Sequence, residues 1–317
     1  MIIQAQAPTR ISLFGGGTDL PIYADTYGGL VLNFTINLRS KVTIYTEEDI
    51  WKIHKNTFPP KGRKEFMDAF IDGFKYWNDN NIRYQSECEA PLESGIGSSA
   101  ASGVAIVGAI NKDKKLNMDK GEIAERTWEI EVNKIGLYGG RQDQYASAFG
   151  GVNSIVFSHD KVEVNPVFPN FVKNIYPSLA LFYTGRNRSS PTIQEGFKEL
   201  TFDQIQILNQ IKQITIKALE PLDKGDIEKV GNLLDRAWRL KQRSNKGVSE
   251  PWIDKIYEKG KKAGALGGKL CGSGGGGFMI FIIKPNKKEE FINHMKFQGI
   301  QWWDFDITFD GVQARIL

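Results

Sequence analysis

Pro91-Leu-Glu-Ser-Gly-Ile-Gly-Ser-Ser-Ala-Ala101 is the most informative stretch of this chain of 317 residues. Its two glycines allow backbone N–H groups to approach an anion closely. The apolar helix expected to follow would point its unpaired N–H groups and the positive end of its dipole at the same place. Ser98 and Ser99 add two hydroxyl groups, one of which could bind Mg²⁺ between phosphates. The stretch predicts a phosphate site, and the alternative is a tight packing turn of small residues.

A second glycine-rich loop, Gly272-Ser-Gly-Gly-Gly-Gly277, matches the G-x-G-x-x-G pattern of dinucleotide-binding folds. That pattern requires a strand before the loop and a helix after it. Here the order is reversed, because Lys259–Gly264 looks helical and the apolar run Phe278–Ile283 predicts a strand. The dinucleotide interpretation is therefore excluded. Five glycines before a buried strand cost conformational entropy, so either two backbones pack together here or a ligand lies close.

The third loop is Arg10-Ile-Ser-Leu-Phe-Gly-Gly-Gly-Thr-Asp19, which ends a predicted strand over Ile2–Phe14. Arg10, Thr18 and Asp19 could present polar groups to a hydroxylated substrate, and the alternative is a hairpin or bulge with a surface salt bridge. The chain contains neither a G-x-x-x-x-G-K-[ST] sequence nor the H-R-D motif. It is thus neither a Walker-type enzyme nor a protein kinase.

Composition restricts the class of protein further. The chain has 41 basic and 37 acidic residues, and a net charge of +4 is too small to indicate a nucleic-acid surface. Two cysteines and three histidines, without ligand spacing, predict neither a disulfide framework nor a zinc site. The first residues lack a signal-peptide pattern, and the longest apolar run is too short to span a bilayer. We expect a cytoplasmic enzyme without nucleic-acid or membrane partners, and a homodimer is one option for its oligomeric state.

Predicted helices and strands alternate irregularly, which favours an α+β fold in both halves. Helical patterns are expected at about 64–78, 190–219, 226–243 and 250–263, and the last strands at about 302–308 and 311–317. Pro166, Pro169 and Pro177 form a reasonable linker. We therefore expect two domains, residues 1–170 and 171–317.

Taken in order, the three loops resemble the GHMP kinase superfamily, which includes galactokinase, homoserine kinase and mevalonate kinase. Pro91–Ala100 is similar to its PxxxGLGSSA motif, with Ile96 in place of leucine, and 272–277 to its GAGGGG motif, with Ser273 in place of alanine. The resemblance extends from Ala7 to about Ile283. It implies an N-terminal domain like ribosomal protein S5 domain 2 and a C-terminal ferredoxin-like α/β sandwich. It also implies ATP and Mg²⁺ as cofactors.

Within the superfamily, three segments are similar to the heptose 7-phosphate kinase branch: 7–21, 141–151 and 183–190. This resemblance implies phosphorylation of the anomeric hydroxyl of D-glycero-D-manno-heptose 7-phosphate, giving the 1,7-bisphosphate. The alternatives are a kinase for a fucose- or galactose-like sugar or a small alcohol, and a sugar- and nucleotide-binding regulator without turnover. The presence of Asp143 and Ser99 argues against the regulator.

The resemblance also implies roles for single residues. Asp143 would orient or deprotonate the attacking hydroxyl, and Arg10 would hold it ionised. Ser99 and Glu131 would bind Mg²⁺, with Glu129 as the competing carboxylate. The expected nucleotide-binding residues are Pro91, Gly95, Ile96, Gly97, Ser98, Ser99, Ala100, Gly274 and Gly275.

For the acceptor, the resemblance implies that Gly17, Thr18 and Asp19 contact sugar hydroxyls. The acceptor is expected to be a sugar phosphate, which requires cationic donors. Arg186 and Arg188 are the first candidates, because arginine can bind a phosphate through two parallel hydrogen bonds. Lys134, Lys241 and Arg243 are the alternatives.

Overall fold

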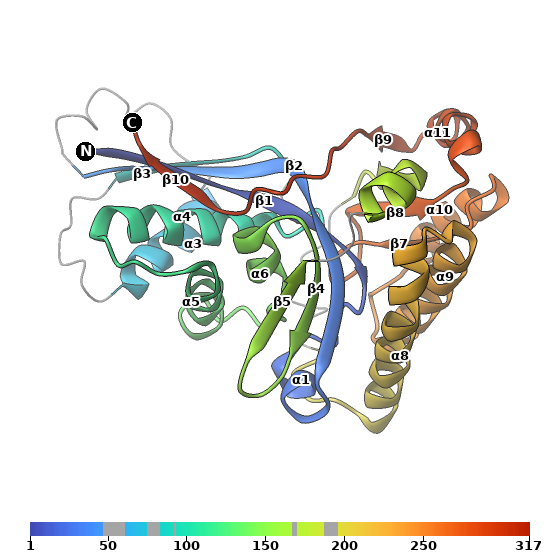
Figure 1. Ribbon diagram of the computed structural model, residues 1–317, viewed down its shortest axis with the longest axis horizontal. Coiled ribbons are helices and arrows are strands. Elements are labelled where there is room, and N and C mark those ends of the chain that lie inside the picture. Colours follow the sequence, from blue (N-terminus) through green and yellow to red (C-terminus); the bar gives the residue numbers. More distant parts are fainter. Residues whose placement is uncertain (47–60, 75–82, 92, 167–169, 187–195) are drawn as a thin grey trace.

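The computed structural model describes residues 1–46, 61–74, 83–91, 93–166, 170–186 and 196–317 (Figure 1). Its strands are β1 (Ile2–Phe14), β2 (Gly29–Tyr45), β3 (Arg83–Cys88), β4 (Val152–Phe157), β5 (Val162–Pro166), β6 (Leu179–Tyr183), β7 (Gly267–Leu270), β8 (Phe278–Ile282), β9 (Gln301–Trp303) and β10 (Gln313–Ile316). Its helices are α1 (Pro21–Tyr27), α3 (Lys61–Gly73), α4 (Ser98–Lys114), α5 (Lys120–Asn133), α6 (Gln142–Phe149), α8 (Phe202–Lys224), α9 (Ile227–Ser244), α10 (Pro251–Lys262) and α11 (Lys288–Phe297).

The first half of the chain forms an antiparallel sheet with the strand order β10-β1-β2-β4-β5, and β3 pairs with the second part of the long strand β2. Helices α3, α4, α5 and α6 lie together beside this sheet (Figure 1). The helix α4 is almost entirely apolar and buried, so it packs through all its faces rather than through one stripe. Its first turn is thereby held rigidly against β1 and β2.

The second half forms a four-stranded antiparallel sheet with the order β7-β8-β6-β9. Along the chain the elements run from β6 through three helices to β7 and β8, and then through α11 to β9. A split arrangement of this kind, with the third strand between the first and the second, is the ferredoxin-like motif. The expected α+β class and the ferredoxin-like C-terminal half are confirmed.

The two halves share one hydrophobic cluster, which contains Ile11 and Phe34 from the first sheet and Leu181 and Ile280 from the second. The last strand also joins them, because β10 pairs with β1 at the edge of the first sheet. The strand expected at 311–317 therefore belongs to the N-terminal sheet. A division into 1–170 and 171–317 does not follow the sheets, and residues 167–169 lie outside the described ranges.

The helix expected at 190–219 begins later and ends later than its periodicity indicates. Thr201 and Gln204 form a capping box that sets its first turn, and Gly225 in the left-handed conformation ends it. Of the expected helix at 64–78, the described part ends with α3 at Gly73, since 75–82 are outside the described residues. No helix in the described ranges is long and apolar enough to cross a membrane.

Candidate active site

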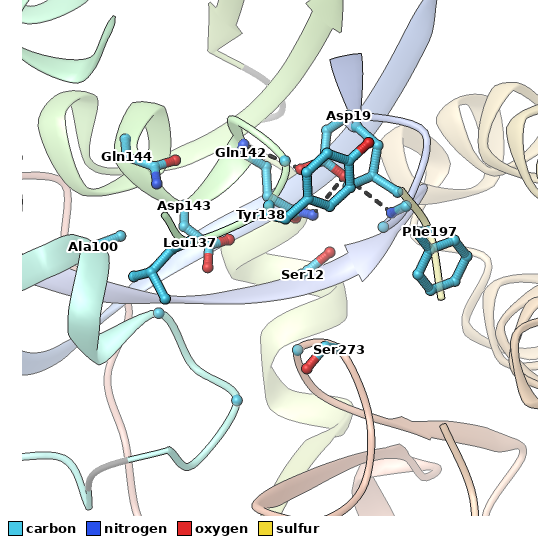
Figure 2. A pocket seen from close by; sticks show the side chains of 18 of the residues that line it. Ser12, Asp19, Ala100, Leu137, Tyr138, Gln142, Asp143, Gln144, Phe197 and Ser273 are labelled. Atoms are coloured by element: carbon cyan, nitrogen blue, oxygen red, sulfur yellow. Dashed lines mark hydrogen bonds between the residues drawn. The ribbon is translucent and has the colours of Figure 1, made fainter. Parts of the chain in front are cut away.

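A pocket of about 320 Å³ is lined by segments from both halves of the chain. One side, called the α4 end here, is formed by Ser98, Ser99 and Ala100 at the start of α4 together with Glu131 of α5. The other side, called the α9 end, is formed by Gly16, Gly17, Asp19, Lys241 and Ser244. Figure 2 shows Asp143 between Ala100 on one side and Asp19 on the other. The carboxylate of Asp143 is 27% exposed, so it faces the open part of the pocket.

Arg10 and Asp143 form a two-pronged ion pair at the centre of the pocket. Arg10 Nε donates to Asp143 Oδ1 at 2.7 Å, and Arg10 Nη2 donates to Asp143 Oδ2 at 2.6 Å. The remaining guanidinium nitrogen, Nη1, donates to the carbonyl of Gly95 at 2.7 Å. Charge-assisted pairs of this geometry are the strong ones. The expectation that Arg10 lies beside Asp143 is confirmed, and Arg10 also ties this pair to the loop before α4.

Three consecutive side chains at the start of α6 point to three different partners. Gln142 Nε2 donates to Asp19 Oδ1 at 2.9 Å, Asp143 pairs with Arg10, and Gln144 Nε2 donates to Glu131 Oε2. Successive residues of a helix are rotated by about 100° from one another, so neighbours in sequence reach opposite sides of a site. Figure 2 shows the dashed contact from Gln142 towards Asp19. One short helix thus orders both ends of the pocket.

The carboxylate of Asp19 is held by backbone and side-chain donors. Its Oδ1 accepts from Gly17 N at 3.0 Å and its Oδ2 from Gln142 N at 3.2 Å. Burial raises the pKa of Asp19, and the nearby charge of Asp143 raises it further. A methyl group on Gly140 would lie 1.9 Å from Asp19 Oδ2, so a side chain fits there only if the Asp19 carboxylate moves. The Asp19 carboxylate is therefore held in a fixed position at the α9 end.

Thr18 does not reach the pocket, which corrects the expectation that it binds a sugar. Its side chain is fully buried. Its hydroxyl lies 2.8 Å from the carbonyl of Gly15 and 3.0 Å from that of Leu30, and it accepts from Leu30 N at 3.1 Å. The hydrogen bonds of this hydroxyl therefore hold the glycine turn against β2. Its neighbours Gly17 and Asp19 line the pocket, as expected.

Glu131 lies at the α4 end with one free carboxylate oxygen. Its Oε2 accepts from Gln144, whereas the buried Oε1 has no partner among the described residues. Burial raises the pKa of Glu131 to about 8, and Asp143 adds to the shift. The competing carboxylate, Glu129, pairs with Arg126 at 3.1 Å and does not line the pocket. An orphaned carboxylate oxygen in the pocket that Ser99 also lines is the hard oxygen ligand that Mg²⁺ prefers.

A metal ion at this place would need a phosphate as a further ligand. The described part of the chain contains no cluster of three or more His, Cys, Asp and Glu side chains that could hold a metal by itself. Magnesium is typically bound through one or two carboxylates together with substrate phosphates. Ser99 and Glu131 are lining residues that could take part in such a site.

The loop before α4 is built as its glycines predict. Gly95 and Gly97 have φ values of 79° and 73°, which side chains rarely adopt. Gly97 is the residue before the first turn of α4, so the unpaired N–H groups of that turn open into the pocket. Of the residues expected to bind nucleotide, Gly95, Gly97, Ser98, Ser99 and Ala100 line the pocket. Pro91 and Ile96 do not, and Ile96 is part of the hydrophobic core instead.

The glycines of the loop at 272–277 serve mainly to pack backbone against backbone. A methyl group on Gly277 would lie 2.2 Å from the carbonyl oxygen of Ser94, and one on Gly274 would lie 2.5 Å from Val248 Cα. Gly275 donates to the carbonyl of Val248 at 3.1 Å. Gly274 and Gly275 do not line the pocket, and their expected contact with nucleotide stays a prediction. Gly272 and Ser273, which precede them, line it instead.

Of the described cations that were expected to bind the acceptor phosphate, one lines the pocket and the others do not. Arg186 does not line the pocket, and its guanidinium lies 5.3 Å from the ring centre of Trp252. Arg188 falls outside the described residues. Lys134 and Arg243 are exposed and also absent from the lining. Lys241 does line it, and its Nζ donates to the carbonyl of Gly272.

Several lining residues were not expected from the sequence. Gln142 could have been found from its position next to Asp143, and Ser12 from its place on the same strand as Arg10. No local signal marks the aromatic and apolar side chains that complete the lining: Leu20, Trp128, Val132, Leu137, Tyr138, Phe197, Leu208 and Ile211.

Comparisons with known proteins agree with this geometry. Residues 64–151 match the GHMP kinases N terminal domain and residues 218–301 match the GHMP kinases C terminal family. The chain is 32% identical to D-glycero-alpha-D-manno-heptose 7-phosphate kinase of Campylobacter jejuni, over 98% of each chain. It is 24% identical to the L-fucokinase/L-fucose-1-P guanylyltransferase of Bacteroides fragilis, over 89% of this chain and 35% of that protein.

A solved structure gives the same result for the fold. The crystal structure of a D-glycero-D-manno-heptose 1-phosphate kinase from Bacteroides thetaiotaomicron covers 99% of both chains with a TM-score of 0.78 and 27% identity. The resemblance seen in the three loops is thus confirmed over the whole length. The chain belongs to the GHMP kinase family of ATP-dependent enzymes.

Proposed function

We propose that this chain transfers the γ-phosphoryl group of ATP to the anomeric hydroxyl of D-glycero-D-manno-heptose 7-phosphate. The observation that carries the proposal is the Arg10–Asp143 pair, which lies between a helix N-terminus and a rigid hydroxyl acceptor in one pocket. The α4 end offers backbone N–H groups for phosphates, and the α9 end offers Asp19 and Gln142 for a sugar. The heptose kinase of Campylobacter jejuni supports the choice of sugar.

In this proposal the nucleotide phosphates lie at the α4 end, on the N–H groups of the first turn and the hydroxyls of Ser98 and Ser99. Ser99 and the free oxygen of Glu131 would hold Mg²⁺, which neutralises charge on the transferring group. Glu131 must ionise to do so, and the metal ion favours that form. Gln144 holds the other oxygen of Glu131, so the free oxygen keeps a fixed direction.

Asp143 acts on the acceptor. Its carboxylate orients the anomeric hydroxyl towards the γ-phosphorus and accepts its hydrogen as the new oxygen–phosphorus bond forms and the bond to the β-phosphate oxygen breaks, releasing ADP. An anomeric hydroxyl is more acidic than an ordinary alcohol, so a carboxylate can serve as the base. Arg10 keeps Asp143 ionised and in place, and it carries positive charge next to the reacting atoms.

The two related heptose kinases are named for different positions of the acceptor phosphate, 7 in one and 1 in the other. A substrate panel decides between them and tests the proposal. The enzyme is incubated with ATP and Mg²⁺ and with heptose 7-phosphate, heptose 1-phosphate, free heptose or fucose, and products are identified by ³¹P NMR. We expect the 1,7-bisphosphate from heptose 7-phosphate at the highest kcat/KM. Preferred turnover of fucose or another unphosphorylated sugar would overturn the proposal, and no turnover of any sugar would favour a binding regulator.

A further inference from the structure

Lys241 is placed where a charged group of the acceptor would arrive. It lies in the last turn of α9 and lines the pocket next to the glycine turn of β1. A methyl group on Gly16 would lie 3.8 Å from Lys241 Nζ, 3.6 Å from Gln142 Nε2 and 3.2 Å from Ser12 Oγ. The amine therefore adjoins the Asp19–Gln142 pair, which is the part of the pocket suited to a sugar.

Two lysines near this point, Lys241 and Lys269, have no carboxylate partner among the described residues, and burial lowers the pKa of both. Two carboxylates lie nearby, Asp19 and Asp143. Asp143 is engaged by Arg10, and Asp19 by amide donors. Neither lysine forms an ion pair with any carboxylate in the described part of the chain. A buried cation without an anion is costly, so an unpaired one in a pocket indicates an anionic ligand.

Of the two lysines, only Lys241 is available to such a ligand. Lys269 is 4% exposed, does not line the pocket, and donates to the carbonyl of Ser12 at 2.6 Å. Lys241 makes one hydrogen bond, to the carbonyl of Gly272, although an ammonium group has three donors. Arg10 is directed elsewhere, since its Nε and Nη2 hold Asp143 and its Nη1 donates to the carbonyl of Gly95. Two N–H groups of Lys241 therefore remain for a bound molecule.

We infer that Lys241 binds the phosphate group of the acceptor and so selects a sugar phosphate over the free sugar. The inference rests on the proposed function, since it assumes that the acceptor enters at the α9 end. Asp19 and Gln142 recognise hydroxyl groups, for which a cation is not needed, whereas lysine is a common ligand of phosphate as a point charge. Burial lowers the pKa of Lys241 to about 8, with Arg10 adding to the shift, so the amine is still charged at neutral pH.

The test compares Lys241→Met with the wild-type enzyme on heptose 7-phosphate and on free heptose. We expect the KM for heptose 7-phosphate to rise about 10- to 100-fold, the scale of one charged hydrogen bond. The preference for the phosphorylated sugar, measured as the ratio of the two kcat/KM values, should fall by the same factor. Lys241→Arg should restore part of it. The matched control is Arg243→Met, which removes an exposed cation on the same helix and should leave both KM values unchanged.

Three results would overturn the inference. An unchanged preference in Lys241→Met would mean that another group binds the phosphate. An equal fall of kcat for both acceptors would instead place Lys241 at the transferring phosphoryl group. A loss that follows a lowered melting temperature, and that Lys241→Arg does not relieve, would make the lysine structural. Failure of the proposed function is distinguishable, because then the wild-type enzyme itself would not prefer heptose 7-phosphate.

Discussion

The α4 end and the α9 end of the pocket are assembled from different kinds of chain. At the α4 end most of the lining comes from one continuous stretch, 95–100, whose backbone conformation and helix start make the site. At the α9 end the lining comes from side chains on β1 and its turn, on α6 and on α9, which are far apart in sequence. Asp143 lies between them and belongs to both (Figure 2).

This difference indicates which end of the pocket can vary between members of the family. A site made of backbone and helix dipole binds what all members of a kinase family share, the phosphates of ATP. A site made of side chains from separate elements can be changed one residue at a time without disturbing the fold. We therefore expect substitutions at the α4 end to affect nucleotide and metal, and those at the α9 end to affect the acceptor.

The largest effect is expected where the two ends meet. Asp143→Asn keeps the shape of the side chain but removes its charge, so kcat should fall at least about 100-fold, the scale of acid–base catalysis. The KM values for ATP and acceptor should change much less. Steady-state kinetics with both substrates varied would measure this, and near-normal turnover would show that the base has been misidentified.

A smaller but more selective effect is expected from Gly140→Ala. Its methyl group would lie 1.9 Å from Asp19 Oδ2, so the carboxylate must move away from Gln142. The acceptor KM should rise more than about tenfold, since a displaced charged partner costs on the order of 1.5–3 kcal/mol. The KM for ATP should stay within about twofold. An ATP defect as large as the acceptor defect would contradict the separation of the two ends.

The two glutamines beside Asp143 give a matched pair of variants. Gln142→Met removes the amide that holds Asp19, whereas Gln144→Met removes the amide that holds Glu131. We expect about a tenfold rise in acceptor KM in the first and about a tenfold rise in the Mg²⁺ concentration for half-maximal activity in the second. Each variant serves as the control of the other. If both variants changed only the acceptor KM, or only the Mg²⁺ requirement, the two glutamines of α6 would not act on separate ends of the pocket.

The smallest effect is a difference in how stability responds to pH. Glu131 has its pKa raised from 4.5 to about 8, so the folded state binds more protons than the unfolded state and its contribution falls as pH rises through this range. Lys241 has its pKa lowered from 10.5 to about 8, so the unfolded state binds more protons and its contribution grows as pH rises above 8.

Melting curves of the metal-free enzyme would separate these two contributions. The melting temperature of Glu131→Gln should rise relative to that of the wild type as pH increases from about 5 to 8. The melting temperature of Lys241→Met should fall relative to that of the wild type as pH increases from about 8 to 10. Parallel curves for wild type and variants would mean that neither group has a shifted pKa.

The sequence predicts the α4 end of the pocket better than the α9 end. Gly95, Gly97 and Ser99 could be predicted because adjacent residues build the structure that binds. Thr18 was misplaced because its position in a motif says nothing about whether its hydroxyl turns inward. The roles of Gly274 and Gly275 cannot be read from the sequence, because a glycine required for close packing looks the same there as one required for a ligand.

The local elements of the fold could likewise be predicted from the sequence, whereas a long-range strand pairing could not. Apolar runs and glycine positions predicted most helices and strands. They did not predict that β10 returns to β1, since pairing of strands that are about 300 residues apart depends on tertiary packing and not on local pattern. Lys241 was one of several cations that the sequence could not rank, because only the fold brings it to Gly16.

The pairing of β10 with β1 also orders events during synthesis. The strand β1 is synthesised about 300 residues before its edge partner β10, and the residues that line the pocket lie between the two strands in sequence. Domains generally fold as they emerge, yet this N-terminal sheet keeps an open edge until the last strand is available, and long-range pairings of this kind form slowly. Until β10 has been synthesised, the edge of β1 at Ile3–Gln6 therefore stays without its strand partner.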